Sequence, residues 1–310
     1  MSRRAWAAFS AMSVLWGVSY LLIKLAVDGG LPAPDVAWLR VALAAVLLLG
    51  LAWRANVLAA VRGRWRWLLA YAVVEVSIPF PLIAAGEVHV ASSLTAIIIA
   101  AVPLISAVLA LRFDHSERPT RRRALGLGVG FSGVIALVGL DVAGSSAQLL
   151  GAAAILVAAV GYSIGPMLVK HRLGGLDPRA MMAASLSLAA LILAPFAAAD
   201  LPGHAPSAGA LLAVAGLGVF CTALAFVVFA VLIREAGTSR ATVITYVNPV
   251  VALALGVTLL GERPGAGAVV GLALILAGSW LSTGGAPGRS GPAGPLAPGR
   301  RSAVGRIGRV

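Results

Sequence analysis

The sequence is poor in charged residues and has almost no cysteine. Asp, Glu, Lys and Arg make up 11% of its 310 residues, whereas a soluble domain carries roughly a quarter. So little charge cannot cover a soluble globule, which excludes that class. Cys221 is the single cysteine, so an intrachain disulfide and a cysteine-based metal site are excluded. The sequence also lacks a nucleotide-binding motif, and we expect no cofactor, no metal and no ATP hydrolysis within this chain.

Long apolar runs fill the chain instead. Hydrophobic residues make up 60% of it, with a mean hydropathy of +0.98. A helix needs about 20 apolar residues to cross the lipid bilayer, and clusters of turn-forming or charged residues separate ten such runs. The sequence therefore predicts an all-α integral membrane protein with spans at about 5–27, 36–53, 67–86, 92–111, 124–140, 149–169, 180–199, 207–233, 241–260 and 265–283.

The distribution of basic residues predicts the orientation of these spans. The net charge of +13 alone would suit a nucleic-acid binder, but the basic residues are not gathered on a polar domain, and we expect no nucleic-acid partner. With the N-terminus in the cytoplasm, 21 of the 24 Lys and Arg residues fall on the cytoplasmic side, and only Arg263 falls in an outer loop. This bias predicts a multi-pass protein of the cell membrane with both termini cytoplasmic.

An internal repeat divides the chain into two halves. Residues 103–139 resemble residues 249–284, with one single-residue gap. Pro103 matches Pro249, and Glu117-Arg118-Pro119 matches Glu262-Arg263-Pro264. We predict one five-helix repeat over residues 1–141 and a second over 149–284, followed by a disordered basic tail over 285–310. Because five is odd, the second half enters the membrane inverted, which is typical of secondary transporters.

Short motifs in both halves carry a resemblance to a known family. They are Trp16-Gly17-Val18-Ser19-Tyr20, Trp38-Leu39-Arg40, Ser92-Ser93-Leu94-Thr95-Ala96, Pro103-Leu104, Tyr246-Val247-Asn248-Pro249-Val250 and Gly261-Glu262-Arg263-Pro264. In order and duplication the chain resembles the EamA family of the drug/metabolite transporter superfamily, over about residues 8–284. The resemblance implies a ten-span permease with a central cavity lined mainly by the first, third and fourth helices of each half. It does not name the substrate.

Glu75 is the most informative single residue. It lies near the middle of the third predicted span, among branched apolar neighbours. An acid at that depth costs a few kcal/mol and is a functional candidate by default. Three roles stay open at this point: a proton carrier, an electrostatic contact for a cationic substrate, or a buried structural hydrogen bond.

Other polar residues within the spans predict a substrate cavity. Thr245, Tyr246 and Asn248 lie together just before Pro249, and Pro103 is its repeat counterpart; proline in a membrane helix predicts a kink or hinge. Ordinary packing between helices is the alternative. The predicted cavity or coupling residues are Glu75, Ser19, Tyr20, Ser92, Tyr162, Ser163, Thr245, Tyr246 and Asn248.

Two further features have competing interpretations. Arg40, near the outer end of the second span, is predicted to form an ion pair with Glu87 at the outer vestibule; pairing with Asp35, reaching outward or binding an anionic substrate are alternatives. The glycine pairs Gly126/Gly130 and Gly267/Gly271 predict close helix contacts on the fifth and tenth spans, either within the monomer or in a homodimer.

The pattern as a whole favours a secondary transporter that moves a small metabolite by alternating access. An amino acid or a related compound is a candidate substrate, and proton coupling is left open. The alternatives are an intramembrane enzyme acting on lipid or peptide, and a receptor or scaffold. Ser163 lies in a G-x-S-x-G pattern, but that motif works at a strand-to-helix turn, and here it falls inside an apolar helix. We therefore expect no catalytic residue.

Overall fold

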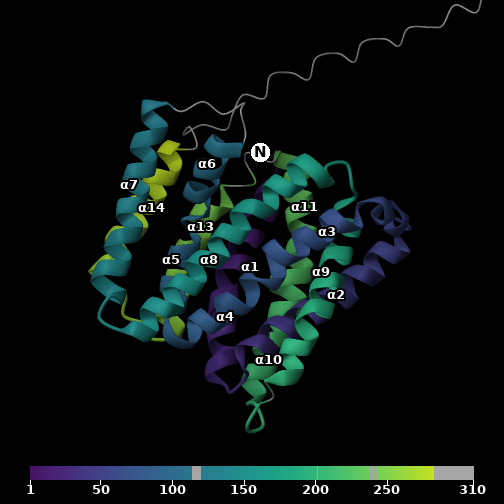
Figure 1. Cartoon of the computed structure of the whole chain (residues 1–310), viewed down its shortest axis with the longest axis horizontal. Coiled ribbons are helices and arrows are strands. Elements are labelled where there is room, and N and C mark those ends of the chain that lie inside the picture. Colours follow the sequence, from purple (N-terminus) through teal and green to yellow (C-terminus); the bar gives the residue numbers. More distant parts are fainter. Residues whose placement is uncertain (114–119, 201, 238–240, 242, 283–310) are drawn as a thin grey trace, which may run out of the picture.

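The structure is a bundle of long helices that run in roughly the same direction (Figure 1). This computed structural model describes residues 1–113, 120–200, 202–237, 241 and 243–282, and the chain within these ranges is helical without strands. The basic tail predicted over 285–310 lies outside the described residues.

Five helical spans make up the first half of the chain, and several consist of two or more consecutive segments. They are α1 (Arg3–Asp28), α2 (Ala33–Arg54), the series η1 (Leu58–Arg64), α3 (Trp65–Tyr71), η2 (Ala72–Ser77) and α4 (Pro79–His89), the pair α5 (Ser92–Ile99) and α6 (Val102–Phe113), and α7 (Arg121–Leu137) continued by η3 (Val138–Val142).

The second half follows the same plan. Its spans are α8 (Ser146–Leu168) continued by η4 (Val169–Leu173), α9 (Pro178–Ala199), the series α10 (Ala208–Gly216), η5 (Leu217–Leu224) and α11 (Ala225–Ala236), α13 (Ile244–Leu259) and α14 (Ala266–Ser282). Eight of the ten spans are long and apolar enough to cross a membrane, and α13 and α14 are shorter apolar helices. The predicted ten-helix, all-α membrane fold is confirmed.

Polar side chains determine where several helices begin. A serine, threonine or aspartate oxygen accepts the main-chain N–H two or three residues into the helix at Ser2, Thr120, Ser145, Asp177 and Ser207, which satisfies a donor that the first turn leaves free. Asp177 also receives the Arg179 side chain at 2.8 and 3.0 Å. These hydrogen bonds hold the pKa of Asp177 below its ordinary value.

Helices of one half pack against helices of the other. The pairs are α1 with α13, α2 with α9, α4 with α8, and α7 with α14. Buried apolar side chains fill the spaces between them, such as Val41 and Leu186 between α2 and α9, and Leu137 and Ile275 between α7 and α14. The boundary between the halves therefore runs through the interior of the bundle, where a transporter of this architecture places its substrate path.

Glycines allow α7 and α14 to approach closely at one edge of the bundle (Figure 1). A Cβ atom on Gly133 would lie 2.8 Å from the main-chain oxygen of Gly271, and one on Gly126 would lie 2.8 Å from that of Gly278. The predicted close contact is thus made within one chain. A homodimer stays a prediction, and it would need a surface other than these glycine faces.

Candidate functional site

Glu75 lies in the π-helical turn η2, at the boundary between the two halves. Its carboxylate lies against Gly165 of α8, and Oε2 is buried without a hydrogen-bond partner among the described residues. A buried polar atom without a partner costs free energy, so the alternative of a structural hydrogen bond to Oε2 has no support. π-Helical turns inside α-helices are frequent at functional sites.

Asn248 is a second residue with a buried side-chain oxygen that has no partner in the described part of the chain. It is 8% exposed, and its Oδ1 has no hydrogen-bond partner among the described residues. Its main-chain oxygen lies 3.3 Å from the place that a Cβ on Gly17 of α1 would take. Because Gly17 has no side chain, α1 approaches α13 closely here. Thr245 and Tyr246 are half-buried on the preceding turn.

The two predicted hinge prolines have different surroundings. Pro103 is the second residue of α6, directly after the break between α5 and α6 at Ala100 and Ala101. Pro249 lies inside α13, which continues unbroken from Ile244 to Leu259. Proline has no N–H, so the carbonyl of Thr245 receives no helical hydrogen bond from position 249. Movement at either proline stays a prediction.

Arg40 does not form the predicted ion pair. It is 7% exposed, its Nε donates to Thr222 Oγ1 at 2.8 Å, and its guanidinium lies 4.2 Å from the centre of the Phe80 ring. Among the described residues, Arg40 has no ion pair with Glu87 or Asp35. Instead the Arg40 Nε is directed to Thr222, whose own hydroxyl donates to Leu217 O within the π-helical η5.

Arg40 lies in a group of polar residues from several helices. It interacts electrostatically with Tyr162 of α8, Cys221 of η5 and Tyr20 of α1, and also with Glu87 of α4. The Arg40 side chain makes no other hydrogen bond to a described residue beyond the one from Nε. Its terminal amino groups are therefore available for a ligand, and Tyr20 and Tyr162 are predicted cavity residues that the structure brings to it.

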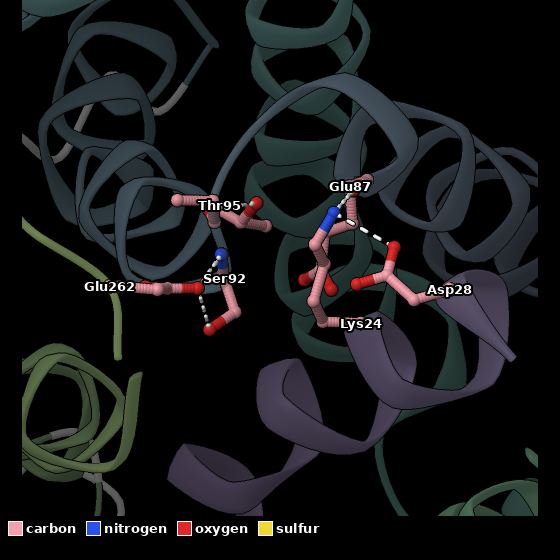
Figure 2. A network of polar contacts seen from close by, with 7 residues as sticks. Lys24, Asp28, Glu87, Ser92, Thr95 and Glu262 are labelled. Atoms are coloured by element: carbon pink, nitrogen blue, oxygen red, sulfur yellow. Dashed lines mark hydrogen bonds and ion pairs between the residues drawn. The ribbon is translucent and has the colours of Figure 1, made fainter. Parts of the chain in front are cut away.

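Glu87 is sealed inside the protein at one end of the bundle. It is 0% exposed, and neither carboxylate oxygen has a hydrogen-bond partner among the described residues. The nearby ammonium of Lys24 instead contacts the main-chain oxygen of Glu87 at 2.8 Å and the Asp28 carboxylate at 3.1 Å (Figure 2). Glu87 is therefore a buried acid without a direct counter-ion, and not half of a vestibule ion pair.

Ser92 has a contact that the sequence did not predict. Its N–H and its hydroxyl both donate to Glu262 Oε1 at 2.8 Å (Figure 2). The N–H of Ser93 donates to Oε2 at 3.0 Å. The Glu262 carboxylate thus caps the start of α5 from the turn between α13 and α14. We call this contact the Glu262 cap. It connects the two halves, and the repeated Glu-Arg-Pro motif was the signal that pointed to Glu262.

The remaining predicted residues lie in helix contacts. The Ser163 hydroxyl is 1% exposed and donates to the main-chain oxygens of Ala159 and Val102 at 2.8 and 3.2 Å, which connects α8 to α6. Ser19 is buried on α1. That the predicted residues line one common passage stays a prediction.

Comparison with known proteins identifies transporters over nearly the whole chain. The sequence model of the EamA-like transporter family matches residues 5–139 and 149–284. An "Uncharacterized transporter" of Archaeoglobus fulgidus is 26% identical over 90% of this chain and 98% of its own length. The "Uncharacterized inner membrane transporter YedA" of Escherichia coli K12 is 29% identical over 82% of each chain.

Two further comparisons concern a named exporter and a solved structure. A "Probable terminal-alkyne amino-acid exporter" of Streptantibioticus cattleyicolor is 30% identical over 91% of this chain and 93% of its own length. A solved crystal structure that is 19% identical covers 91% of this chain and 98% of its own, with a TM-score of 0.66. At that identity the solved structure shows the fold alone.

Proposed function

The chain belongs to the EamA-like transporter family, and from this premise we propose that it exports an amino acid or a related small compound in exchange for protons. As a member of this family it is a multi-pass membrane permease for small metabolites. The proposal adds the substrate class, the direction and the coupling ion.

The substrate class is supported by one relative and by one arginine. The relative with 30% identity is named a probable exporter of a terminal-alkyne amino acid. In this chain Arg40 is buried at the boundary between the halves with its terminal amino groups available. A guanidinium recognises a carboxylate through paired hydrogen bonds, and every amino acid carries that group.

Proton coupling is supported by the partnerless carboxylate oxygen of Glu75, which is the observation that carries the proposal. Burial without a partner favours the neutral, protonated form of an acid. Glu75 belongs to the first half and Gly165, against which it lies, belongs to the second. When the halves move relative to one another, water reaches the carboxylate from one side, and the proton leaves there. The same group binds a proton again when the other side opens.

The distribution of basic residues supports an orientation as well. We propose that the protein lies in the cell membrane with both termini in the cytoplasm, because that arrangement places 21 of 24 basic residues inside.

We also propose that it has no catalytic role. The serine of the G-x-S-x-G pattern donates its hydroxyl to two main-chain oxygens, and this contact supports a packing role for that residue.

Transport by the purified full-length chain in liposomes tests the proposal. Vesicles loaded with one radiolabelled amino acid at a time, terminal-alkyne analogues included, are placed under an imposed pH gradient. We expect at least one amino acid to move against its own gradient when protons move in the opposite direction. Movement of only another metabolite class, or movement that does not depend on the pH gradient, would contradict the proposal.

A further inference from the structure

Glu87 is a second buried acid, and the proposed proton carrier Glu75 does not account for it. It lies in the last turn of α4, is 0% exposed, and both of its carboxylate oxygens lack a hydrogen-bond partner among the described residues. Glu75, in comparison, has one such oxygen. A carboxylate that is sealed from water on both oxygens is stable when neutral and costly when ionised.

The charges around Glu87 do not compensate for this burial. Lys24 and Asp28 of α1 and Arg40 of α2 act on Glu87 electrostatically. Glu87 in turn acts on Tyr20 of α1. Lys24 directs its ammonium to a main-chain oxygen and to Asp28 (Figure 2), and Arg40 directs its Nε to Thr222. Among the described residues of α5, α8 and η2, no titratable group acts on Glu87.

The remaining charge that acts on Glu87 is the carboxylate of the Glu262 cap. That cap holds the start of α5 in the first half to the α13–α14 turn in the second, through the hydrogen bonds from Ser92 and Ser93. Gly256 leaves the space that the Glu262 side chain fills, since a Cβ there would collide with it. The cap therefore holds the two halves together at this end of the bundle, and we call this end closed while these hydrogen bonds are made.

Glu87 and the cap share one short segment of chain. Glu87 precedes Ser92 by five residues, across the turn between α4 and α5. If Glu87 ionised while the cap was closed, a second negative charge without a partner would lie near Glu262, in a region of low dielectric where like charges repel strongly. The closed cap and a neutral Glu87 therefore stabilise one another.

We propose that Glu87 is a proton-binding site linked to the Glu262 cap, with the proton bound while this end of the bundle is closed and released when it opens. The inference rests on the proposed function in that a proton is the coupling ion, but the site rests on its own geometry. The sign follows from linkage: the closed state binds one proton more than the open state, so a rising pH shifts the population toward the open state.

Distance measurements between two spin labels test this without any substrate. Val88 follows Glu87 in α4, and Leu259 lies three residues before Glu262. They are 50% and 65% exposed, so labelled cysteines there, with Cys221 replaced by Ala, disturb little packing. In the full-length chain reconstituted in bilayers, we expect the ratio of long to short distances to rise with pH. If one proton is linked to the opening, the ratio of long to short distances should change about tenfold per pH unit within the transition.

The variants separate Glu87 from the other acids. Glu87→Gln should keep the short distance at every pH between about 5 and 9, whereas Glu87→Asp should keep a pH-dependent change. Glu235→Gln is the matched control, because Glu235 is an exposed acid that accepts a hydrogen bond from Ser2 at 3.0 Å and has no part in the proposed coupling, and it should behave like the wild type in this measurement. If Glu87→Gln is not recovered folded, Glu87→Met provides a second neutral side chain with the same expected result.

Two results would overturn the inference: a wild-type distance distribution that does not change with pH, or a Glu87→Gln variant that changes with pH as the wild type does. Neither depends on transport. If no amino acid is transported while the distances follow pH through Glu87, the proposed substrate is wrong and the proton site stands. If transport is proton-driven while the distances ignore pH, the proposed function stands and the Glu87 site is wrong.

Discussion

The carboxylate of Glu75 and the Cα of Gly165 lie in direct contact across the boundary between the two halves. A Cβ atom at position 165 would collide with Glu75 Oε2 and would lie 2.7 Å from its Cδ. The acid therefore has its present place because residue 165 has no side chain. Any larger residue at 165 must move the carboxylate or separate α8 from η2.

We predict that Gly165→Ala lowers both stability and proton-driven transport. Overpacking of this kind costs about 1–3 kcal/mol, and displacement of Glu75 should reduce transport at least as much as it reduces folded protein. Gly128→Ala on α7 is the control, because nothing lies within 4 Å of a Cβ there, and it should leave both unchanged. Thermal unfolding in detergent and transport per folded molecule measure the two effects. Equal behaviour of the two variants would show that Gly165 has no special role.

A second prediction concerns the contact that replaced the expected ion pair. Thr222→Val removes the acceptor of Arg40 Nε and leaves a buried guanidinium donor without a partner, so it should lower stability by about 1–3 kcal/mol. Thr258→Val changes the same residue type at an exposed site, where the hydroxyl donates to Ala254 within its own helix, and should cost less than about 0.5 kcal/mol. A Thr222→Val variant as stable as Thr258→Val would mean that the Arg40 contact contributes little.

The spans could be predicted from the sequence because the bilayer requires a long apolar run for each of them. The second span, predicted at 36–53, begins and ends within three residues of Ala33–Arg54. The repeat was visible for a similar reason, since Pro103 and Pro249 occupy corresponding places in two runs of similar composition.

The contacts of the polar residues could not be predicted in the same way. Arg40 donates to Thr222 of the π-helical η5. There the Thr222 hydroxyl donates to Leu217 O five residues earlier, whereas in an α-helix a threonine hydroxyl bonds the carbonyl three or four residues earlier. Ser92 was assigned to the cavity by its place in a motif, but its partner Glu262 is distant in sequence. Such contacts depend on how two halves pack, and apolar periodicity contains no information about them.

A third prediction concerns the orientation of the chain in the membrane. Single cysteines placed at Arg64, Gly144, Gly174 and the C-terminus are treated with a membrane-impermeant reagent on intact cells. We expect the reagent to label position 144 alone, because the other three positions face the cytoplasm. Gly174 is preferred to its neighbour Gly175, whose φ of 84° favours glycine and would strain a substitution. Cys221 is 2% exposed and should not react. Labelling of the C-terminus from outside intact cells would contradict the ten-span orientation.

The last prediction is that Glu75→Gln abolishes proton-driven transport without unfolding the protein. Glutamine has nearly the same shape and cannot ionise, so it mimics the protonated state of a carboxylate whose Oε2 is buried without a partner. A proton carrier fixed in its loaded state can still move between its two conformations. Reconstituted vesicles should therefore lose accumulation under a pH gradient by tenfold or more, while exchange of labelled for unlabelled substrate continues.

The roles left open for Glu75 give different results in this experiment. If Glu75 binds a cationic group of the substrate, exchange should fall together with driven transport, because binding itself weakens. If Glu75 is only structural, both activities should fall in proportion to the folded protein recovered. Glu235→Gln is the control, since that exposed acid accepts a hydrogen bond from Ser2 at 3.0 Å and should transport as the wild type does. Unchanged rates and pH dependence in Glu75→Gln vesicles would rule out both functional roles, because a group that binds the coupling proton or the substrate cannot be neutralised without an effect on one of the two rates.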